Sequence, residues 1–465
     1  MSGSTTPTTA ELSRARGHGR AAAPVRLVHL GLGNFFRAHQ AWYTDRAPDA
    51  EEWGIGAFTG RSPRLADELT AQEGLYTLVT RAGDGDRFAV VGSLSRAHPA
   101  ADHESWLGYF RSPDVRAVTV TVTEAGYLRG TGGGLDRNRP EVRADVEALR
   151  RDVTGVTRTA PARLLAGLAA RRAADAGPLA LVPCDNLPDN GAVVARVVGD
   201  VAETVDPGLR DWVESSVSYV TTMVDRITPR TTDDDVRTVA AATGLHDRSP
   251  VVTEPFSEWV LSGAFPGGRP RWEDAGAAIT DDVAPFEQRK LWLLNGGHSL
   301  LAYAGSARGD VTVADAVADD TCRAWLQEWW TEASRHLSQP AADVSAYRDA
   351  LLDRFANPRM HHRLDQIAAD GSQKLPVRIL PVLRMERADG RVPQGAAFVL
   401  AAWVCHLRGA GAPVTDARAD NVVPLAAGPL PQAVRRVLGA LDPGLAADDD
   451  IVTAVVTHAE QLEKS

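Results

Sequence analysis

Short apolar runs bounded by turn-forming residues recur through about the first 200 positions, and each has the length of a strand. One of them, residues 115–123, alternates valine and threonine, as half-buried strands do. Two others flank Gly83-Asp84-Gly85, which predicts a hairpin. The predicted strands are Val25–Leu30, Trp53–Phe58, Tyr76–Thr80, Arg87–Val91, Val115–Thr123 and Pro178–Pro183.

Helical periodicity takes over at about residue 281, where apolar residues recur at the spacing of one helix face. Before this point strands alternate with helical stretches, which predicts an α/β domain with a mainly parallel sheet. Residues 206–280 give a mixed pattern and no clear assignment. The helices predicted after residue 281 are Pro285–Ser306, Val313–Leu337, Ala341–Phe355, Gly395–His406 and Leu430–Leu441.

Composition excludes several classes of protein. The net charge of -10 argues against a general nucleic-acid binder, which normally presents a basic face. No run of about 18 apolar residues occurs, so no membrane span is predicted. Residues 1–23 lack the apolar core of a secretory signal and predict a disordered tail. The three cysteines lie far apart without metal-ligand spacing, so we expect no metal site and a reducing, cytoplasmic location.

The strand at Val25–Leu30 runs into Gly31-Leu32-Gly33 and then a helical stretch. This order is the shape of a dinucleotide-binding turn, in which the first glycine makes the tight turn. The second glycine lets the backbone approach a pyrophosphate at the helix N-terminus. The third glycine of the usual fingerprint is replaced by Phe36. The alternative is a generic strand-to-helix turn, since this motif alone has low specificity.

The choice between NAD and NADP stays open from the sequence. The acid that usually holds the ribose hydroxyls of NAD lies at the end of the second strand. Here that segment, Phe58 to Arg64, contains no acid and two arginines, Arg61 and Arg64. Arginines at this place suit the 2′-phosphate of NADP, although solvated loop charges are the commoner case.

Only three of the 50 basic residues are lysines, so Lys290 and Lys374 stand out in an arginine-rich chain. Lysine, unlike arginine, can lose its proton near neutral pH when burial lowers its pKa. At roughly 100° per residue, Glu287, Lys290, Asn295 and His298 fall within an arc of about 140°. Such a face would suit acid/base chemistry at a hydroxyl or carbonyl oxygen. The alternative is an ordinary amphipathic helix in which Lys290 pairs with Glu287.

Six segments follow one another along the chain: GLGNFFRAHQAWY, TVTEAGY, CDNLPDNG, VDRITPR, KLWLLNGGHSLLAY and DGSQKLPVR. In this order they resemble the polyol-specific long-chain dehydrogenase/reductase family, from about residue 24 to the C-terminal region. The resemblance implies a Rossmann-type domain with extra strands at 24–205, an extension at 206–280 and a mostly α-helical substrate domain at 281–465. It also implies catalysis without zinc, with NAD as the usual cofactor and NADP in some members.

The resemblance also implies roles for individual residues. Lys290 matches the general acid/base, and Asn186, Asn295 and His298 match ligands of the reacting oxygen. Glu287 matches a position linked to proton exchange with solvent. The cofactor side would comprise Gly31, Gly33, Asn34, Phe36, Arg37 and Glu124, although for Glu124 a structural role such as capping a turn is favoured over a contact to the ribose. Asp225 matches a contact to a substrate hydroxyl. Apart from the resemblance, Lys374, with Arg363 and Arg378 nearby in sequence, could receive distal hydroxyls or a carboxylate of the substrate, and a surface turn is the alternative.

The expected activity is hydride transfer between a nicotinamide and a secondary alcohol, of the mannitol/fructose or mannonate/fructuronate type. Tagaturonate- or arabinitol-type substrates remain alternatives within the same chemistry. A non-catalytic Rossmann-fold nucleotide sensor would not need the lysine, asparagine and histidine constellation. A zinc-dependent polyol dehydrogenase would need metal ligands. The expected partner is a small sugar molecule, without nucleic acid or membrane, and the chain is expected to be a monomer or a small homo-oligomer.

Overall fold

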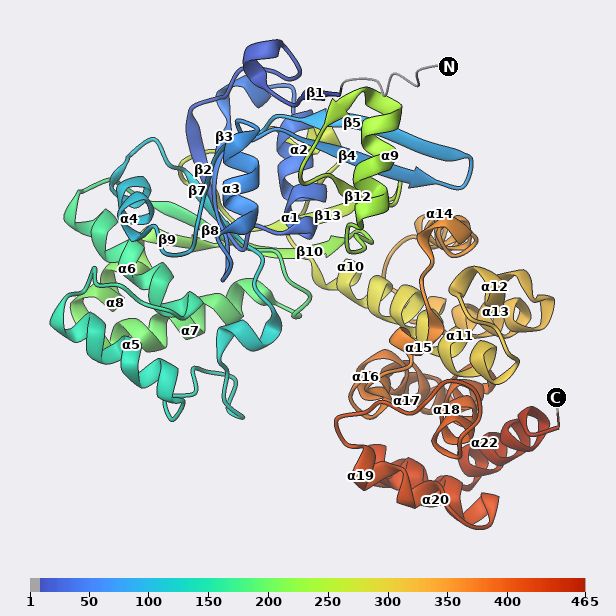
Figure 1. Cartoon of the computed structure of the whole chain (residues 1–465). Coiled ribbons are helices and arrows are strands. Elements are labelled where there is room, and N and C mark those ends of the chain that lie inside the picture. Colours follow the sequence, from blue (N-terminus) through green and yellow to red (C-terminus); the bar gives the residue numbers. More distant parts are fainter. Residues whose placement is uncertain (1–8, 465) are drawn as a thin grey trace, which may run out of the picture. The chain divides into compact units, whose positions relative to one another are not determined.

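The computed structural model describes residues 9–464, which form two compact units (Figure 1). The first unit ends at Ala284 and the second begins at Pro285. Among the described helices, none has both the length and the apolar character that crossing a membrane requires.

A six-stranded parallel sheet in the order β6-β3-β2-β7-β8-β9 forms the centre of the first unit. Counted along the chain, this order is 3-2-1-4-5-6, the order of a Rossmann sheet. The prediction of a Rossmann-type α/β domain is therefore confirmed. The strands are β2 (Val25–Leu30), β3 (Gly54–Phe58), β6 (Leu94–His98), β7 (Ala117–Val120), β8 (Leu179–Pro183) and β9 (Val217–Tyr219).

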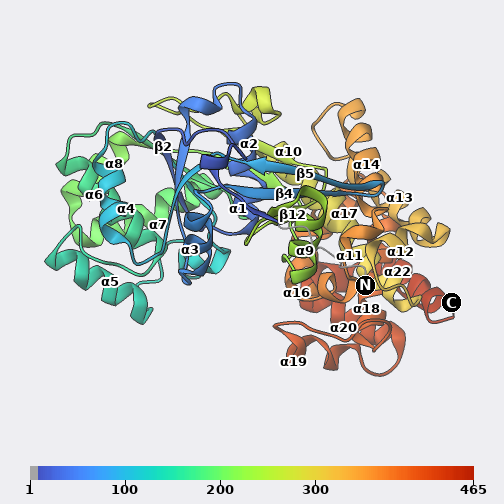
Figure 2. The same cartoon turned by 45° about the horizontal axis from the view of Figure 1, so that its top comes forward.

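Both faces of this sheet are buried, because neighbouring residues of a strand point to opposite sides. In β2, Val28 and Leu30 pack into one apolar cluster and Leu27 into another. The first cluster includes helices α4 (His103–Arg111), α6 (Ala160–Ala173) and α7 (Asn190–Val205). The second includes α1 (Asn34–Ala38), α2 (Gln40–Arg46) and α3 (Arg64–Ala71). Figure 2 shows the two groups of helices on either side of the strands.

Two three-stranded sheets and one two-stranded sheet complete the described part of this unit. The predicted hairpin is confirmed and gains a parallel partner from far along the chain, β12. Residues 206–280, whose pattern was mixed, contribute strands to all of the sheets. The additional strands are β4 (Tyr76–Ala82), β5 (Gly85–Val91), β10 (Thr221–Asp225), β12 (Val251–Thr253), β13 (Glu258–Ser262) and β14 (Ala278–Ile279).

The prediction of a disordered tail over residues 1–23 is wrong from residue 9 onward, and residues 1–8 lie outside the described chain. Strand β1 (Ala10–Glu11) pairs in parallel with β11 (Leu245–His246). Leu12 is buried, and the guanidinium of Arg14 donates to the carbonyl oxygens of Gly92 and Leu94 at 2.9 Å. These partners are distant in sequence, so local composition could not reveal them.

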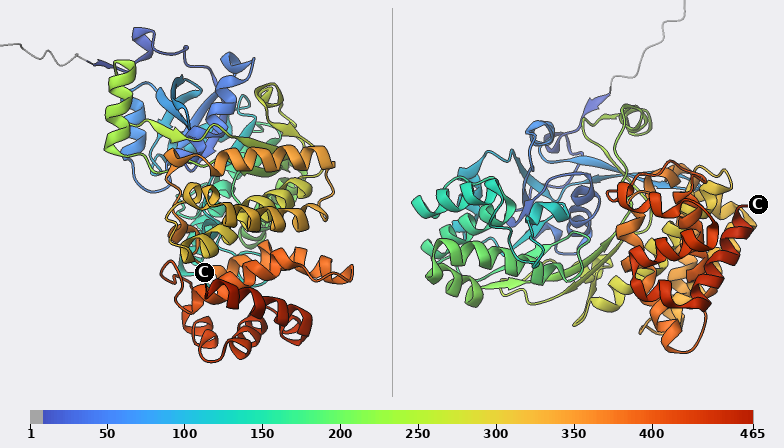
Figure 3. Two further views of the ribbon diagram at one scale, coloured as in Figure 1. Left: turned by 90° about the vertical axis from the view of Figure 1, so that its right-hand side faces the viewer. Right: turned by 90° about the horizontal axis from the view of Figure 1, so that it is seen from below.

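The second unit consists of helices packed around α11 (Gly296–Ala307), which is buried along almost its whole length (yellow in Figure 3). The continuous helix predicted over Val313–Leu337 is wrong: it breaks at Asp319 into two helices. The Asp319 carboxylate accepts a hydrogen bond from the backbone N–H of Thr321 at 2.7 Å and so caps the second one. The helices that bear on the site are α12 (Val313–Ala318), α13 (Asp320–Ser334), α14 (Ala341–Phe355), α16 (Gly371–Arg378), α17 (Leu380–Ala388) and α18 (Gln394–Leu407).

A buried carboxylate holds three segments of this unit together. The side chain of Glu386, on α17, is 1% exposed and accepts hydrogen bonds from Arg335 at 2.7 Å and from His336 and Arg391 at 2.6 Å each. Burial by itself would raise the pKa of Glu386, but these three partners lower it to about 2. The group therefore stabilises the folded unit when it is ionised.

We expect Glu386→Gln to lower the free energy of unfolding by about 1–3 kcal/mol at neutral pH, the usual range for hydrogen bonds to a charged group. The folded pKa lies below the unfolded value of about 4.3, so this contribution is complete above pH 5 and is lost as the pH falls toward 2. Urea unfolding at several pH values measures it. Glu463→Gln, which removes an exposed ion pair with Arg408, is the control and should cost less than about 1 kcal/mol. Equal costs for the two variants would contradict the prediction.

Candidate active site

The loop after β2 turns tightly, and its first glycine is required by the fold. Gly31 has a φ of +114°, a conformation that other residues rarely adopt. A Cβ atom at this position would lie 2.4 Å from the carbonyl oxygen of Thr121, just beyond β7. The Thr121 hydroxyl also donates to the Gly31 carbonyl oxygen at 2.9 Å. The loops after strands 1 and 4 of the Rossmann order therefore meet here, at the switch point where such sheets bind ligands.

The second glycine has no such internal requirement. A Cβ at Gly33 would come no closer than 3.5 Å to the described atoms around it, with the Gly31 carbonyl oxygen as its neighbour. The space above Gly33 is thus left open by the protein itself. At the third fingerprint position, the ring of Phe36 stacks on buried His29 with ring centroids 3.5 Å apart. A ring pair therefore joins α1 to β2 where a glycine usually allows close packing.

Asn34 and Arg37 brace this loop from inside. The Arg37 guanidinium is buried and donates to the carbonyl oxygens of Gly33 and Ser249 and to the Asn34 side chain. Asn34 in turn donates to Thr231 at 3.3 Å. The helical stretch predicted after the loop is divided: helix α1 contains only five residues, and the chain bends at His39 into α2. Because α1 is so short, the backbone N–H groups of the loop are more available to a ligand than the dipole of a long helix.

The segment after β3 is exposed and carries two arginines, as the sequence indicated. Arg64 pairs with Glu68 on α3 at 2.6 Å. Arg61 makes no hydrogen bond or ion pair among the described residues. No carboxylate occurs between Phe58 and Arg64.

The loop after β8 presents Asn186 at the carboxyl end of the sheet, where its side chain is exposed. Its neighbour Asp185 is buried and accepts hydrogen bonds from the Tyr127 hydroxyl and from the backbone N–H of Leu187. Asn190 donates to the Thr222 carbonyl oxygen at 3.0 Å and ties the loop to β10. These residues fix the loop that carries Asn186. The neighbouring Glu124 lies exposed at the start of a short 3₁₀ turn, Glu124–Tyr127.

Asp225 is the last residue of β10 and is buried. The next side chain, Arg226, stacks over the Trp42 ring at 4.3 Å and donates to the carbonyl oxygens of Ala38 and Glu254. The segment after Asp225 is thereby held against α1, beside the loop Gly31–Gly33, called the glycine loop below.

The lysine helix is not a regular α-helix. It consists of α10 (Ala284–Arg289), a π-helical turn over Lys290–Asn295 and then α11. A π turn pairs residues five apart and brings them toward the same side of the helix. Lys290 and Asn295, about 140° apart on an α-helix, are such a pair. The π turn therefore brings Lys290 and Asn295 closer to the same side of the helix than regular α-helical spacing predicts. Such turns occur frequently at functional sites.

Two tryptophans of α13 stabilise this turn. The indole N–H of Trp329 donates to the Trp292 carbonyl oxygen at 2.9 Å, and that of Trp330 to the Leu293 carbonyl oxygen at 2.8 Å. The close approach depends on the glycine pair after Asn295. A Cβ at Gly296 would lie 2.8 Å from the Trp329 indole nitrogen, and one at Gly297 would lie 3.1 Å from that of Trp330. No pattern in the sequence indicates a role for these glycines or indoles, because the contact joins helices far apart along the chain.

His298 follows one turn later and is buried. Its ring stacks on Phe355 at 4.6 Å and lies edge-on to His362 at 4.9 Å. Its Nε2 atom has no hydrogen-bond partner in the described part of the chain. Burial lowers its pKa well below the usual value, and the charges of His362, Arg354, Arg378 and Lys374 lower it further. A neutral imidazole with a buried, unsatisfied nitrogen suits a ligand hydroxyl or carbonyl oxygen.

Helix α16 brings two cations to this part of the unit. Lys374 is partly buried, and its amino group donates to the Ile367 carbonyl oxygen at 3.1 Å. Arg378, one turn later, donates to the Asn295 carbonyl oxygen at 3.2 Å and to the Ser299 hydroxyl at 3.1 Å. Arg363 is exposed and forms a two-pronged ion pair with Asp365, so the structure does not bring it to this group.

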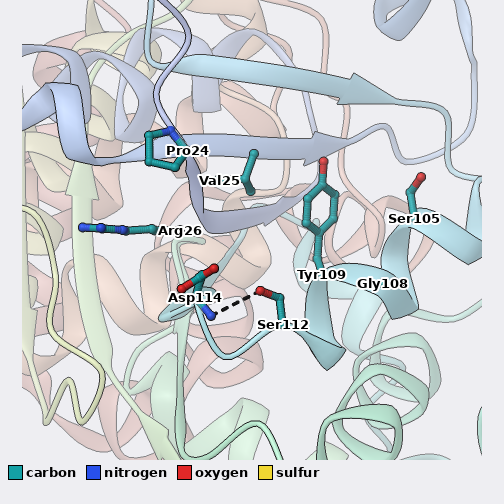
Figure 4. A pocket seen from close by; sticks show the side chains of 8 residues that line it. All are labelled: Pro24, Val25, Arg26, Ser105, Gly108, Tyr109, Ser112 and Asp114. Carbon is teal, nitrogen blue, oxygen red and sulfur yellow. Dashed lines mark hydrogen bonds between the residues drawn. The ribbon is translucent and has the colours of Figure 1, made fainter. Parts of the chain in front are cut away.

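A separate hollow of about 520 Å³ lies at the other end of β2 (Figure 4). Pro24, Val25 and Arg26 at the start of the strand line it, together with Tyr109 and Asp114. Since β2 runs from Val25 to Leu30, the hollow faces away from the glycine loop and is no part of this site.

Comparison with known proteins gives a consistent result for both units. Residues 25–274 match the family model of the mannitol dehydrogenase Rossmann domain, and residues 282–463 match that of the mannitol dehydrogenase C-terminal domain. D-mannonate oxidoreductase of Escherichia coli (strain K12) is 36% identical over 83% of this chain and 80% of its own length. D-arabinitol 4-dehydrogenase of Ralstonia nicotianae is 38% identical over 84% of each. The structure of Pseudomonas fluorescens mannitol 2-dehydrogenase with NAD and D-mannitol is similar, with a TM-score of 0.78, 32% identity and coverage of 95% of this chain and 92% of that one.

The two glycines of the loop should respond differently to substitution. We expect Gly31→Ala to lower the free energy of unfolding by about 1–3 kcal/mol, because of its left-handed backbone and the contact with Thr121. Gly33→Ala has room for its methyl group and should stay within about 0.5 kcal/mol of the parent. Urea unfolding of both variants measures the difference, and a Gly33→Ala variant as unstable as Gly31→Ala would refute it.

Removing one indole N–H should weaken the π turn. We expect Trp329→Phe to cost about 1–3 kcal/mol in the free energy of unfolding, since the Trp292 carbonyl loses a buried partner. Trp325→Phe is the matched control on the same helix, because the Trp325 indole donates no hydrogen bond among the described residues and mainly stacks on Phe398. Thermal and urea unfolding compare the two, and an equal loss of stability would contradict the assigned role.

Proposed function

The chain belongs to the mannitol dehydrogenase family and is an oxidoreductase, and we propose that it interconverts a secondary alcohol of a polyol or aldonate with the matching ketose or keto-uronate. The observation that carries this proposal is the π turn, which groups Lys290, Asn295 and the unsatisfied Nε2 of buried His298 on one helix. An amine, an amide and a neutral imidazole together can bind one oxygen and move one proton.

In the oxidation direction, neutral Lys290 accepts the proton of the substrate hydroxyl. Asn295 and Asn186 donate hydrogen bonds to the oxygen as negative charge develops on it, and His298 orients it. In the reduction direction, the Lys290 ammonium returns the proton to the carbonyl oxygen. Glu287 precedes Lys290 by one turn and would exchange the proton with solvent. Asp225 would hold a further substrate hydroxyl.

The cofactor in this proposal is NAD, whose nicotinamide exchanges a hydride with the carbon that bears the oxygen. The open space above Gly33 fits the close approach of a pyrophosphate to backbone N–H groups. Arg37 and Asn34 would act by keeping the loop in shape, and Glu124 would lie near the ribose. The segment after β3 supplies no acid for the NAD ribose, so NADP stays an alternative that Arg61 would favour.

The lysine assignment is tested by Lys290→Ala. We expect turnover to fall by roughly two to four orders of magnitude, the usual scale of a general acid/base. Assays with NADH and NADPH, each with fructose, fructuronate, tagatose and tagaturonate, follow the loss of nicotinamide absorbance. Added methylamine should restore part of the activity, since a small amine can occupy the space of the missing side chain and carry the proton.

Lys464→Ala, near the end of the chain and exposed, is the control and should leave turnover unchanged. Near-normal turnover in Lys290→Ala would exclude it as the acid/base. Parent protein that binds a nicotinamide but reduces no substrate would favour the non-catalytic sensor. Loss of parent activity on chelation would favour metal-dependent chemistry.

A further inference from the structure

Arg378 is a partly buried guanidinium without an ion-pair partner in the described chain. It donates through one nitrogen, Nη1, to the Asn295 carbonyl oxygen and the Ser299 hydroxyl. Its Nε and Nη2 atoms, which together form the fork that binds carboxylates, make no hydrogen bond among the described residues. Burial lowers the pKa of Arg378 to about 10, so it stays charged at neutral pH. The Nε and Nη2 atoms are not shut off from solvent, so this fork is open to a ligand, and a bound anion would pair with its uncompensated charge.

The Arg378 guanidinium lies next to the part of the lysine helix that carries Asn295 and His298. Its partners Asn295 and Ser299 flank His298 in sequence, on the same turn of helix. Arg354 and Lys374 also act electrostatically on His298, so several positive side chains lie around this histidine.

Two carboxylates near this group, Asp370 and Asp416, act on Lys374, and both already accept hydrogen bonds from other residues. Asp370 and Asp416 raise the pKa of Lys374, while burial and Arg378 lower it. Asp416 accepts hydrogen bonds from the backbone N–H and the hydroxyl of Ser372 at 2.8 and 2.6 Å, and Asp370 accepts one from the backbone N–H of Ala417 at 2.9 Å. Lys374 thus has counter-charges nearby, whereas Arg378 has none among its contacts.

We propose, building on the oxidoreductase function above, that the natural substrate carries a carboxylate which Arg378 binds through its Nε/Nη2 fork with Lys374 beside it. The substrate class is then an aldonate and its keto-uronate, and neutral polyols are poor substitutes. A neutral polyol would leave the arginine charge uncompensated, and a site built around a polar group discriminates strongly against analogues that lack it. Arginine is suited to this task because its planar fork matches the two carboxylate oxygens.

Two pairs of ketoses test the inference on the full-length parent enzyme. Fructuronate and fructose differ only at the end of the chain remote from the ketone, which is a carboxylate in one and a hydroxymethyl group in the other. Tagaturonate and tagatose form a second such pair of different stereochemistry. We expect kcat/KM for the acid to exceed that for the neutral sugar by at least about 100-fold in one pair, the scale of a lost charged hydrogen bond.

Arg378→Gln removes the charge and the guanidinium fork and leaves a shorter, neutral polar side chain on the helix. It should lower kcat/KM for the keto-uronate by about 100-fold or more, mainly through KM, and change the value for the neutral sugar by less than about threefold. Arg435→Gln removes an exposed charge that pairs with Asp449, and it should alter neither. An equal fall for both sugars would show that Arg378 is only structural and would overturn the inference.

The kcat/KM values of the parent enzyme for the four ketoses test the carboxylate site even if the Arg378 variant does not fold. Equal or better reduction of the neutral sugar in both pairs would sink the carboxylate site and leave the oxidoreductase function intact. Failure to reduce any of the four ketoses with either nicotinamide would instead count against the proposed function, and the carboxylate inference would fall with it.

Discussion

The close approach of α13 to the lysine helix is the constraint on which the second unit depends. Two indole N–H groups reach backbone carbonyls inside the π turn, and they do so because Gly296 and Gly297 carry no side chains. The turn then sets the register between Lys290 and the asparagine and histidine that follow it. A change in the packing of these helices would therefore change the chemistry, although neither tryptophan belongs to the proposed reaction.

In the first unit too, buried side chains fix the loops that carry the exposed groups. The Rossmann strand order brings Thr121 against Gly31 and Tyr127 against Asp185, so the loops after β2 and β8 are fixed by side chains from the neighbouring β7 region. The exposed groups, Asn186 and the open backbone at Gly33, rest on this buried support. In both units the residues open to a ligand are few, and the larger number beneath them serve to hold position.

Much of the fold could be predicted because strand and helix patterns are local. Strand β2 and helices α14 and α20 (Leu430–Leu441) begin and end at the predicted residues. The break at Asp319 was missed because apolar spacing continues across a capping residue. The pairing of residues 10–11 with β11 was missed because short strands of ordinary composition give no periodic signal.

The sequence by itself determined the Rossmann-type and helical division, the glycine loop and the membership of Lys290, Asn295 and His298 in one helix. Each follows from neighbours along the chain, which a pattern can register. Only the tertiary structure decided that this helix contains a π turn, that Arg37 supports the loop from within and that Arg363 turns to Asp365 while Arg378 meets Asn295. Apart from the Arg363–Asp365 pair and the contacts of Arg37 with Gly33 and Asn34, these outcomes depend on partners tens of residues away or more. Helical periodicity carries no information about such partners.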